Sequence, residues 1–168
     1  MSLTAYAGFW LRFVAYIVDY IIIQIAQSII IFPLLSIFGI SFYSFNEDID
    51  WEYMSEGEIV ALIATAIGAA GAAITIALLI QVLYYTFMEA SKYQGTVGKL
   101  VLGLKVTDME GNALDFPKAF IRNLAKILSG MILLIGYIMA GFTDKKQALH
   151  DIVAGALVVR KDEAPGDI

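Results

Sequence analysis

The sequence contains no cysteine and a single histidine, His150. Without cysteine the chain has no disulfide, no thiolate nucleophile and no cysteine-based metal site. One histidine is too few for a conventional structural zinc site, so neither a metal nor a cofactor is expected. No spacing of residues predicts a nucleophile with its base and orienting group, and the sequence does not predict an enzyme.

Charged residues are also scarce, at 16% of the sequence, whereas aliphatic, aromatic and Met residues make up 60%. A soluble domain is nearer a quarter charged. The excess of apolar residues therefore predicts a chain that lies in lipid, and 168 residues are enough for one membrane domain. The net charge of −5 predicts no affinity for nucleic acid or anionic lipid, although this average conceals a steep charge asymmetry along the chain.

Basic residues are absent from residues 39–58, and this absence sets the predicted topology. An apolar helix is expected at about 9–38 and a second at about 59–88, and each is long enough to cross the bilayer. Ten of the eleven basic residues follow the second helix, from Lys92 onward. By the positive-inside rule, residues 39–58 lie outside and the N-terminus lies in the cytoplasm.

The remaining sequence predicts a cytoplasmic segment at 89–116, a third apolar segment at 117–142 and a cytoplasmic C-terminal segment at 143–168. Leu102–Asp108 and Ala113–Phe116 are predicted as strands around a turn, and Ala156–Arg160 as a further strand of a small sheet. Glycines interrupt the third apolar segment, which favours an interfacial or re-entrant helical pair, and a full span is the alternative. The predicted fold is thus an all-α membrane protein with a small cytoplasmic β element.

Small residues recur along the second apolar helix, where Ala64, Gly68 and Ala72 are spaced by four. Such a stripe allows another helix to approach closely. It is expected to pack against the first helix of the same chain, with a dimer face as the alternative.

An arginine and an aspartate, Arg12 and Asp19, interrupt the first apolar helix. They are seven residues apart, so they share a helical face with Tyr16. An ionisable residue inside a span is costly and indicates a functional site, although a buried structural pair is the alternative. Because both side chains lean toward the helix N-terminus, a direct contact between them would be stretched.

The two residues are therefore expected to belong to a larger network. Arg12 is expected to meet a carboxylate, and Asp19 a donor such as Tyr16, Lys99 or water. The carboxylates considered for Arg12 are Glu89, Asp144 and Asp151.

Two further motifs bear on this network. His150 and Asp151 are adjacent and suit proton handling near pH 7, but a solvated turn or a helix cap is the commoner explanation for such a pair. Gly95–Lys99 superficially resembles a phosphate loop but lacks the Walker spacing, so Lys99 is expected near lipid headgroups or the acidic residues.

Taken together, several motifs resemble the RDD family of prokaryotic membrane proteins, which is named for one arginine and two aspartates. The matching segments are Gly8-Phe-Trp-Leu-Arg12 with Asp19, Gly95-Thr-Val-Gly-Lys99, Gly103-Leu-Lys-Val106, Gly111, Arg122 and His150-Asp151 with Ala154-Gly155. The resemblance covers nearly the whole chain and assigns the naming residues to Arg12, Asp19 and Asp151. It implies a multi-pass protein of the prokaryotic cytoplasmic membrane, and cation/proton antiport for some members.

Three functions compete at this point. The first is cation/proton exchange or related transport, in which Asp19 alternates between a proton and a monovalent cation and Arg12 holds a gate through Asp151. It would require a homo-oligomer, because so few spans enclose little pathway. The second is an adaptor that binds a partner protein, and the third is recognition of a lipid headgroup by Lys118, Arg122 and Lys126.

Overall fold

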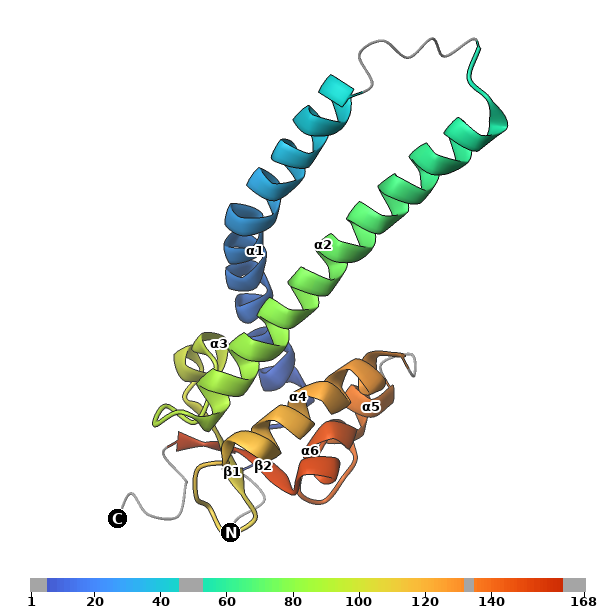
Figure 1. Ribbon diagram of the computed structural model, residues 1–168. Coiled ribbons are helices and arrows are strands. Elements are labelled where there is room, and N and C mark those ends of the chain that lie inside the picture. The colour runs from blue at the N-terminus through green and yellow to red at the C-terminus, as the bar shows by residue number, and fades with distance from the viewer. Residues whose placement is uncertain (1–5, 46–52, 132–134, 162–168) are drawn as a thin grey trace. The chain divides into compact units, whose positions relative to one another are not determined.

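Two long apolar helices dominate the computed structural model, which describes residues 6–45, 53–131 and 135–161. Helix α1 covers Phe9–Phe45 and helix α2 covers Glu56–Ala90 (Figure 1). Both are long and apolar enough to cross a bilayer, and most of their large apolar side chains are exposed. The prediction of a helical membrane protein is therefore confirmed.

Helix α1 is longer than predicted, because it continues through Pro33 and Gly39 to Phe45. Proline removes one backbone donor, but helices in lipid tolerate it where neighbouring groups satisfy the freed carbonyl. These two residues had suggested an earlier end to the helix.

Helix α2 begins before the predicted Ile59 because Ser55 and Glu58 form a capping box. The Ser55 amide donates to Glu58 Oε2 at 2.8 Å, and the Glu58 amide donates to Ser55 Oγ at 3.3 Å. The two side chains satisfy backbone donors that the first helical turn leaves unpaired.

The chain divides into two compact units. Ile23–Ile80 forms the helical-pair unit, and Met1–Ile22 with Gln81–Ile168 forms the charged unit. In the helical-pair unit, buried Gln27 donates to the Ala77 carbonyl oxygen at 2.8 Å. This bond joins the two helices.

The small-residue stripe of α2 does not pack against α1 as expected. Ala64, Gly68 and Ala72 are exposed, and a methyl group added at Gly68 would meet no atom within 4 Å. The dimer face that was the alternative stays a prediction.

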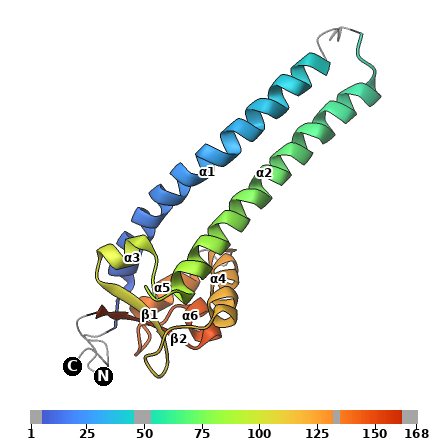
Figure 2. The same cartoon turned by 60° about the vertical axis from the view of Figure 1, so that its left-hand side comes forward.

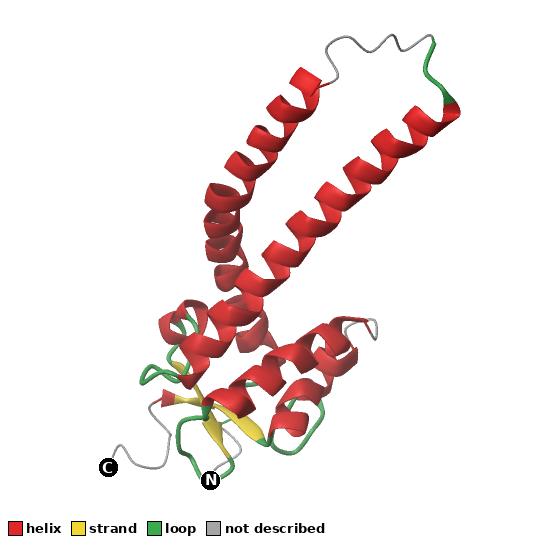
Figure 3. Ribbon diagram, viewed as in Figure 1, coloured by secondary structure: helices red, strands yellow, loops and turns green. Residues whose placement is uncertain are grey.

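The charged unit contains the remaining elements, which Figures 2 and 3 show around two short strands. In chain order they are α3 (Val97–Val101), β1 (Leu104–Asp108), α4 (Phe116–Met131), α5 (Ile135–Ile138), η2 (Met139–Gly141), α6 (Leu149–Ala154) and β2 (Ala156–Arg160). Strands β1 and β2 pair antiparallel, with Leu104 opposite Arg160. This pairing agrees with the predicted small sheet.

The segment directly before α1 extends this sheet, because the Ala7 amide donates to the Val158 carbonyl oxygen at 2.9 Å. Gly155, at φ 59°, ends α6 in the left-handed conformation and turns the chain directly into β2. A small apolar core fills the space between these elements, and Ala7, Val106 and Val158 in it are completely buried. The sheet thus fixes Tyr6, Ala7 and α6 in the same unit.

The predicted short strand Ala113–Phe116 is reduced to one bridge, between Thr107 and Ala113. Asp115 instead lies directly before α4 and caps it, because its side chain accepts the Lys118 amide hydrogen at 2.8 Å. The third apolar segment then forms a helical pair in which α4 and the α5–η2 helix are bent by 119°. A bent pair of helices can be a re-entrant pair or one broken span, so the interfacial or re-entrant pair and the full span both stay predictions.

Candidate functional site

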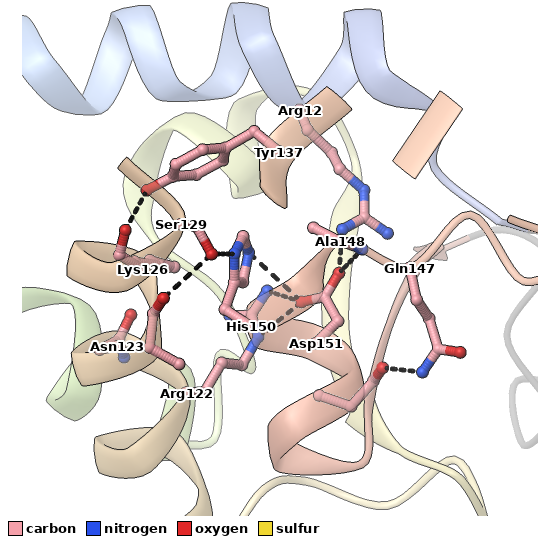
Figure 4. Close-up of polar contacts among 12 residues, drawn as sticks. Arg12, Arg122, Asn123, Lys126, Ser129, Tyr137, Gln147, Ala148, His150 and Asp151 are labelled. Atoms are coloured by element: carbon pink, nitrogen blue, oxygen red, sulfur yellow. Dashed lines mark hydrogen bonds and ion pairs between the residues drawn. The ribbon is translucent and has the colours of Figure 1, made fainter. Parts of the chain in front are cut away.

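A buried guanidinium, that of Arg122 on α4, lies at the centre of an ion-pair network (Figure 4). Its Nη1 lies 2.5 Å from Glu89 Oε2 on α2. Its Nε and Nη2 lie 2.9 and 2.6 Å from Asp151 Oδ1 on α6. Arg122 therefore joins two carboxylates from different helices, and both are completely buried.

In the described residues, three further polar groups contact Glu89 besides Arg122. Lys99 Nζ lies 2.5 Å and Lys126 Nζ 3.2 Å from its Oε1, and Asn123 Nδ2 lies 3.1 Å from its Oε2. Burial lowers the pKa of Lys99, and the charge of Glu89 offsets part of that effect. A fully paired carboxylate of this kind is expensive to disrupt.

Both carboxylate oxygens of Asp151 also have donors in the described residues. Arg12 Nη1 binds its Oδ2, which also accepts the Ala148 amide hydrogen at 3.1 Å. Burial would raise the pKa of Asp151, but the charges of Arg12 and Arg122 outweigh it and hold the pKa well below its usual range. Asp151 is thus ionised at any physiological pH.

Arg12 connects three separate segments through its guanidinium. Besides Asp151, it donates from Nε to the Ala7 carbonyl oxygen at 2.8 Å and from Nη2 to the Lys146 carbonyl oxygen at 2.6 Å. Of the three carboxylates considered for Arg12, only Asp151 binds it in the described residues. Asp144 is exposed.

Asp19 forms a separate site whose donors are all neutral in the described part of the chain. Its Oδ1 accepts from Tyr84 Oη at 3.0 Å and from the Gly98 amide at 2.8 Å, and its Oδ2 accepts from Thr96 Oγ1 at 2.5 Å. The side chain is buried at 1% exposure. Asp19 is therefore a buried carboxylate with hydrogen bonds but without the ion pairs that Glu89 and Asp151 have.

The prediction that Tyr16 or Lys99 donates a hydrogen bond to Asp19 was wrong. Tyr16 is 45% exposed and lies against the Tyr20 ring, and Lys99 binds Glu89 instead. Tyr16 and Asp19 are three residues apart, so their side chains diverge enough around the helix for one to be exposed and the other buried. Arg12 and Asp19 consequently take part in different sets of contacts.

The basic face of α4 was also placed wrongly at the membrane surface. Lys118 is exposed, but Arg122 is buried and Lys126 bonds to Glu89. The spacing of four correctly predicted that these residues share one face of α4. This face packs against buried carboxylates on α2 and α6 and does not lie at the membrane surface.

Three residues that the sequence analysis had not assigned complete the two sites, namely Tyr84, Thr96 and Asn123. Thr96 lies inside the Gly95–Lys99 motif, so that motif was the available signal. Neither Tyr84 nor Asn123 stands in a pattern that distinguishes it from other polar residues of a helix.

His150 is buried beside Asp151 and does not lie in a solvated turn. Its Nε2 lies 3.6 Å from Asp151 Oδ1, its Nδ1 lies 3.4 Å from Ser129 Oγ, and its ring lies against Tyr137. Burial lowers the pKa of His150 well below its usual range; Asp151 opposes this effect and Arg122 adds to it. The imidazole is therefore neutral in the folded protein at pH 7.

Acidification is expected to destabilise the protein through His150. The pKa of His150 is lower in the folded state than in the unfolded state, where it is near 6.5. The free energy of unfolding therefore has its full value above pH 6.5 and decreases as the pH falls below 6.5. The loss should reach roughly 1 kcal/mol at about pH 5.5. Thermal unfolding in detergent between pH 7.5 and 5.5 measures it, and His150→Gln should flatten the slope. An equal slope in wild type and variant would contradict this assignment.

Comparison with known proteins places these residues in a family. The sequence model of the RDD family matches residues 6–155. YxaI of Bacillus subtilis (strain 168) is 41% identical over 92% of this chain and 97% of that relative. YteJ of the same organism, named a membrane protein, is 25% identical over 94% of this chain and 82% of its own length.

A third Bacillus subtilis relative, YckC, is 23% identical over 94% of this chain and 87% of its own length. No solved structure matches the chain. The family match spans Arg12, Asp19 and Asp151, which the structure places in two buried polar sites within the charged unit. The chain belongs to the RDD family of membrane proteins.

Proposed function

We propose that this protein exchanges a monovalent cation for a proton at Asp19. The observation that carries the proposal is the contrast among the buried carboxylates. Glu89 and Asp151 are each held by basic side chains, whereas Asp19 has only two hydroxyls and one amide as donors in the described residues. A carboxylate without an ion pair can be neutralised by either a proton or a cation.

The surroundings of Asp19 suit a small hard cation. Thr96 Oγ1 and Tyr84 Oη already lie within 3.0 Å of its carboxylate. Hydroxyl oxygens can accept as well as donate, so both could turn their lone pairs toward a cation held by Asp19. Oxygen ligands are those that hard cations prefer.

Helix α3 would connect this site with the ion-pair network. The amide of Gly98 binds Asp19, and the next residue, Lys99, binds Glu89. A movement of α3 on cation binding would therefore change the Lys99–Glu89 contact. This contact would connect the exchanging carboxylate of Asp19 with the gate formed by Arg12 and Asp151.

The proposal includes a homo-oligomer in the prokaryotic cytoplasmic membrane, with both termini in the cytoplasm. Two long apolar helices enclose little pathway alone, and a transport pathway generally runs between repeated elements. The exposed small-residue stripe of α2, which contains Gly68, is available for such a contact.

Flux in reconstituted liposomes tests the exchange. Wild-type protein should dissipate an imposed proton gradient when Na⁺, Li⁺ or K⁺ is added outside, and Asp19→Asn should abolish this flux because the asparagine amide cannot take up and release a proton. Asp144→Asn is the matched control, since it removes an exposed aspartate, and it should leave the flux unchanged.

Size-exclusion profiles of the three proteins must agree, so that a loss of flux is not a loss of fold. Wild-type vesicles without cation-dependent proton movement would refute the proposal. So would equal flux in the wild type and Asp19→Asn. Either result would favour the adaptor function over transport.

A further inference from the structure

A shallow aromatic groove of about 380 Å³ lies at the beginning of α1. It is lined by Gly8, Phe9, Trp10, Ile138, Gly141, Phe142 and Lys146. Its aromatic side chains are unusually open, with Trp10 74% and Phe142 84% exposed. We propose that this groove binds one anionic phospholipid, with an acyl chain along the aromatic side chains and the phosphate at Lys146.

The position of the groove, at the end of the apolar helix α1, supports a lipid as its occupant. Helix α1 begins at Phe9, and apolar sequence continues from there along the span. Tryptophan near the end of a span is typical of the membrane interface, where headgroups meet acyl chains. Trp10 and Phe13, whose ring centroids are 6.2 Å apart, continue the aromatic surface along α1. An acyl chain could follow this surface from the groove.

The charges at the rim specify an anionic headgroup. Lys146 Nζ donates to the Gly141 carbonyl oxygen at 3.2 Å and, in the described part of the chain, binds no carboxylate. An ammonium group has three donors, so two remain for a phosphate. Lys146 is the one charged residue among those that line the groove. The rim therefore carries a net positive charge beside an apolar surface.

The proposal moves the lipid site away from the residues first considered for it. Arg122 and Lys126 bond to buried carboxylates, so they are not available to a headgroup. The new site does not depend on transport, and protein without any cation flux could still bind this lipid.

Native mass spectrometry of the full chain with phosphatidylglycerol and phosphatidylcholine of matched acyl chains tests the site. Wild-type protein should retain phosphatidylglycerol preferentially. The variant Lys146→Gln should lose about fivefold in affinity, because one lysine contributes that much near an anionic surface. The matched control, Lys118→Gln, removes one exposed lysine outside the groove and should keep the preference.

The apolar part of the site is tested with Phe142→Ala, which should weaken binding of both lipids. Phe32→Ala is its control, since Phe32 is 73% exposed and lies outside the groove. Equal binding of the two lipids by wild-type protein would overturn the proposal. Equal losses in the groove variants and their controls would also overturn it, as would displacement of the lipid by inorganic phosphate alone.

Discussion

Arg122→Met should destabilise the protein by about 3 to 5 kcal/mol, the usual cost of removing one partner from a buried ion pair. Arg122 is 1% exposed and is the residue that bonds to both Glu89 and Asp151. Methionine fills a similar volume but leaves both carboxylates short of a positive charge. The destabilisation arises because each buried carboxylate loses one positive partner and keeps only Lys99 and Lys126 at Glu89 and Arg12 at Asp151.

Retention of a monodisperse peak after heating in detergent measures this effect. Lys118→Met provides the matched control, since Lys118 lies one helical turn earlier on α4 and is exposed. Arg122→Lys should fall between the two, because it keeps the charge but cannot reach both carboxylates with a planar group.

A double variant separates lost charge from lost packing. Because Arg122 and Glu89 share one ion pair, Arg122→Met combined with Glu89→Gln should lose less stability than the sum of the losses of the two single variants. If Arg122→Met were as stable as Lys118→Met, the network would not hold the charged unit together.

The sequence was most informative where one physical effect dominates. Exclusion of charge from lipid predicted both long helices, although Pro33 and Gly39 suggested too early an end for the first. The lean of helical side chains toward the N-terminus correctly separated Arg12 from Asp19 and directed Arg12 toward three candidate carboxylates, of which Asp151 binds it in the described residues. Both conclusions follow from local geometry and solvent alone.

The sequence was least informative where the partners come from distant elements. Asp19 binds Tyr84, Thr96 and Gly98, which are 65 to 79 residues away. A hydroxyl or a backbone amide has no sequence pattern that marks it as the donor for a particular carboxylate. The same limit explains Arg122, because its helical face was evident but the buried acids that meet this face were not.

Gly98→Ala is expected to disrupt the Asp19 site although it adds only one methyl group. The new Cβ would overlap the Ala15 carbonyl oxygen and lie 3.0 Å from Asp19 Cγ. A backbone carbonyl inside α1 cannot move aside as a flexible side chain can, so α3 must shift instead. That shift would lengthen the 2.8 Å bond from the Gly98 amide to Asp19.

Two costs combine in this variant. Overpacking typically costs about 1 to 3 kcal/mol, and loss of a hydrogen bond to a charged group adds about 1.5 to 3 kcal/mol. Thermal unfolding in detergent measures the sum, with Gly68→Ala as the matched control, because a methyl group at Gly68 meets no atom within 4 Å. Gly68→Ala should be neutral or stabilising, since alanine favours helix over glycine. A Gly98→Ala protein as stable as Gly68→Ala would show that α3 does not approach α1 as closely as the Asp19 site requires.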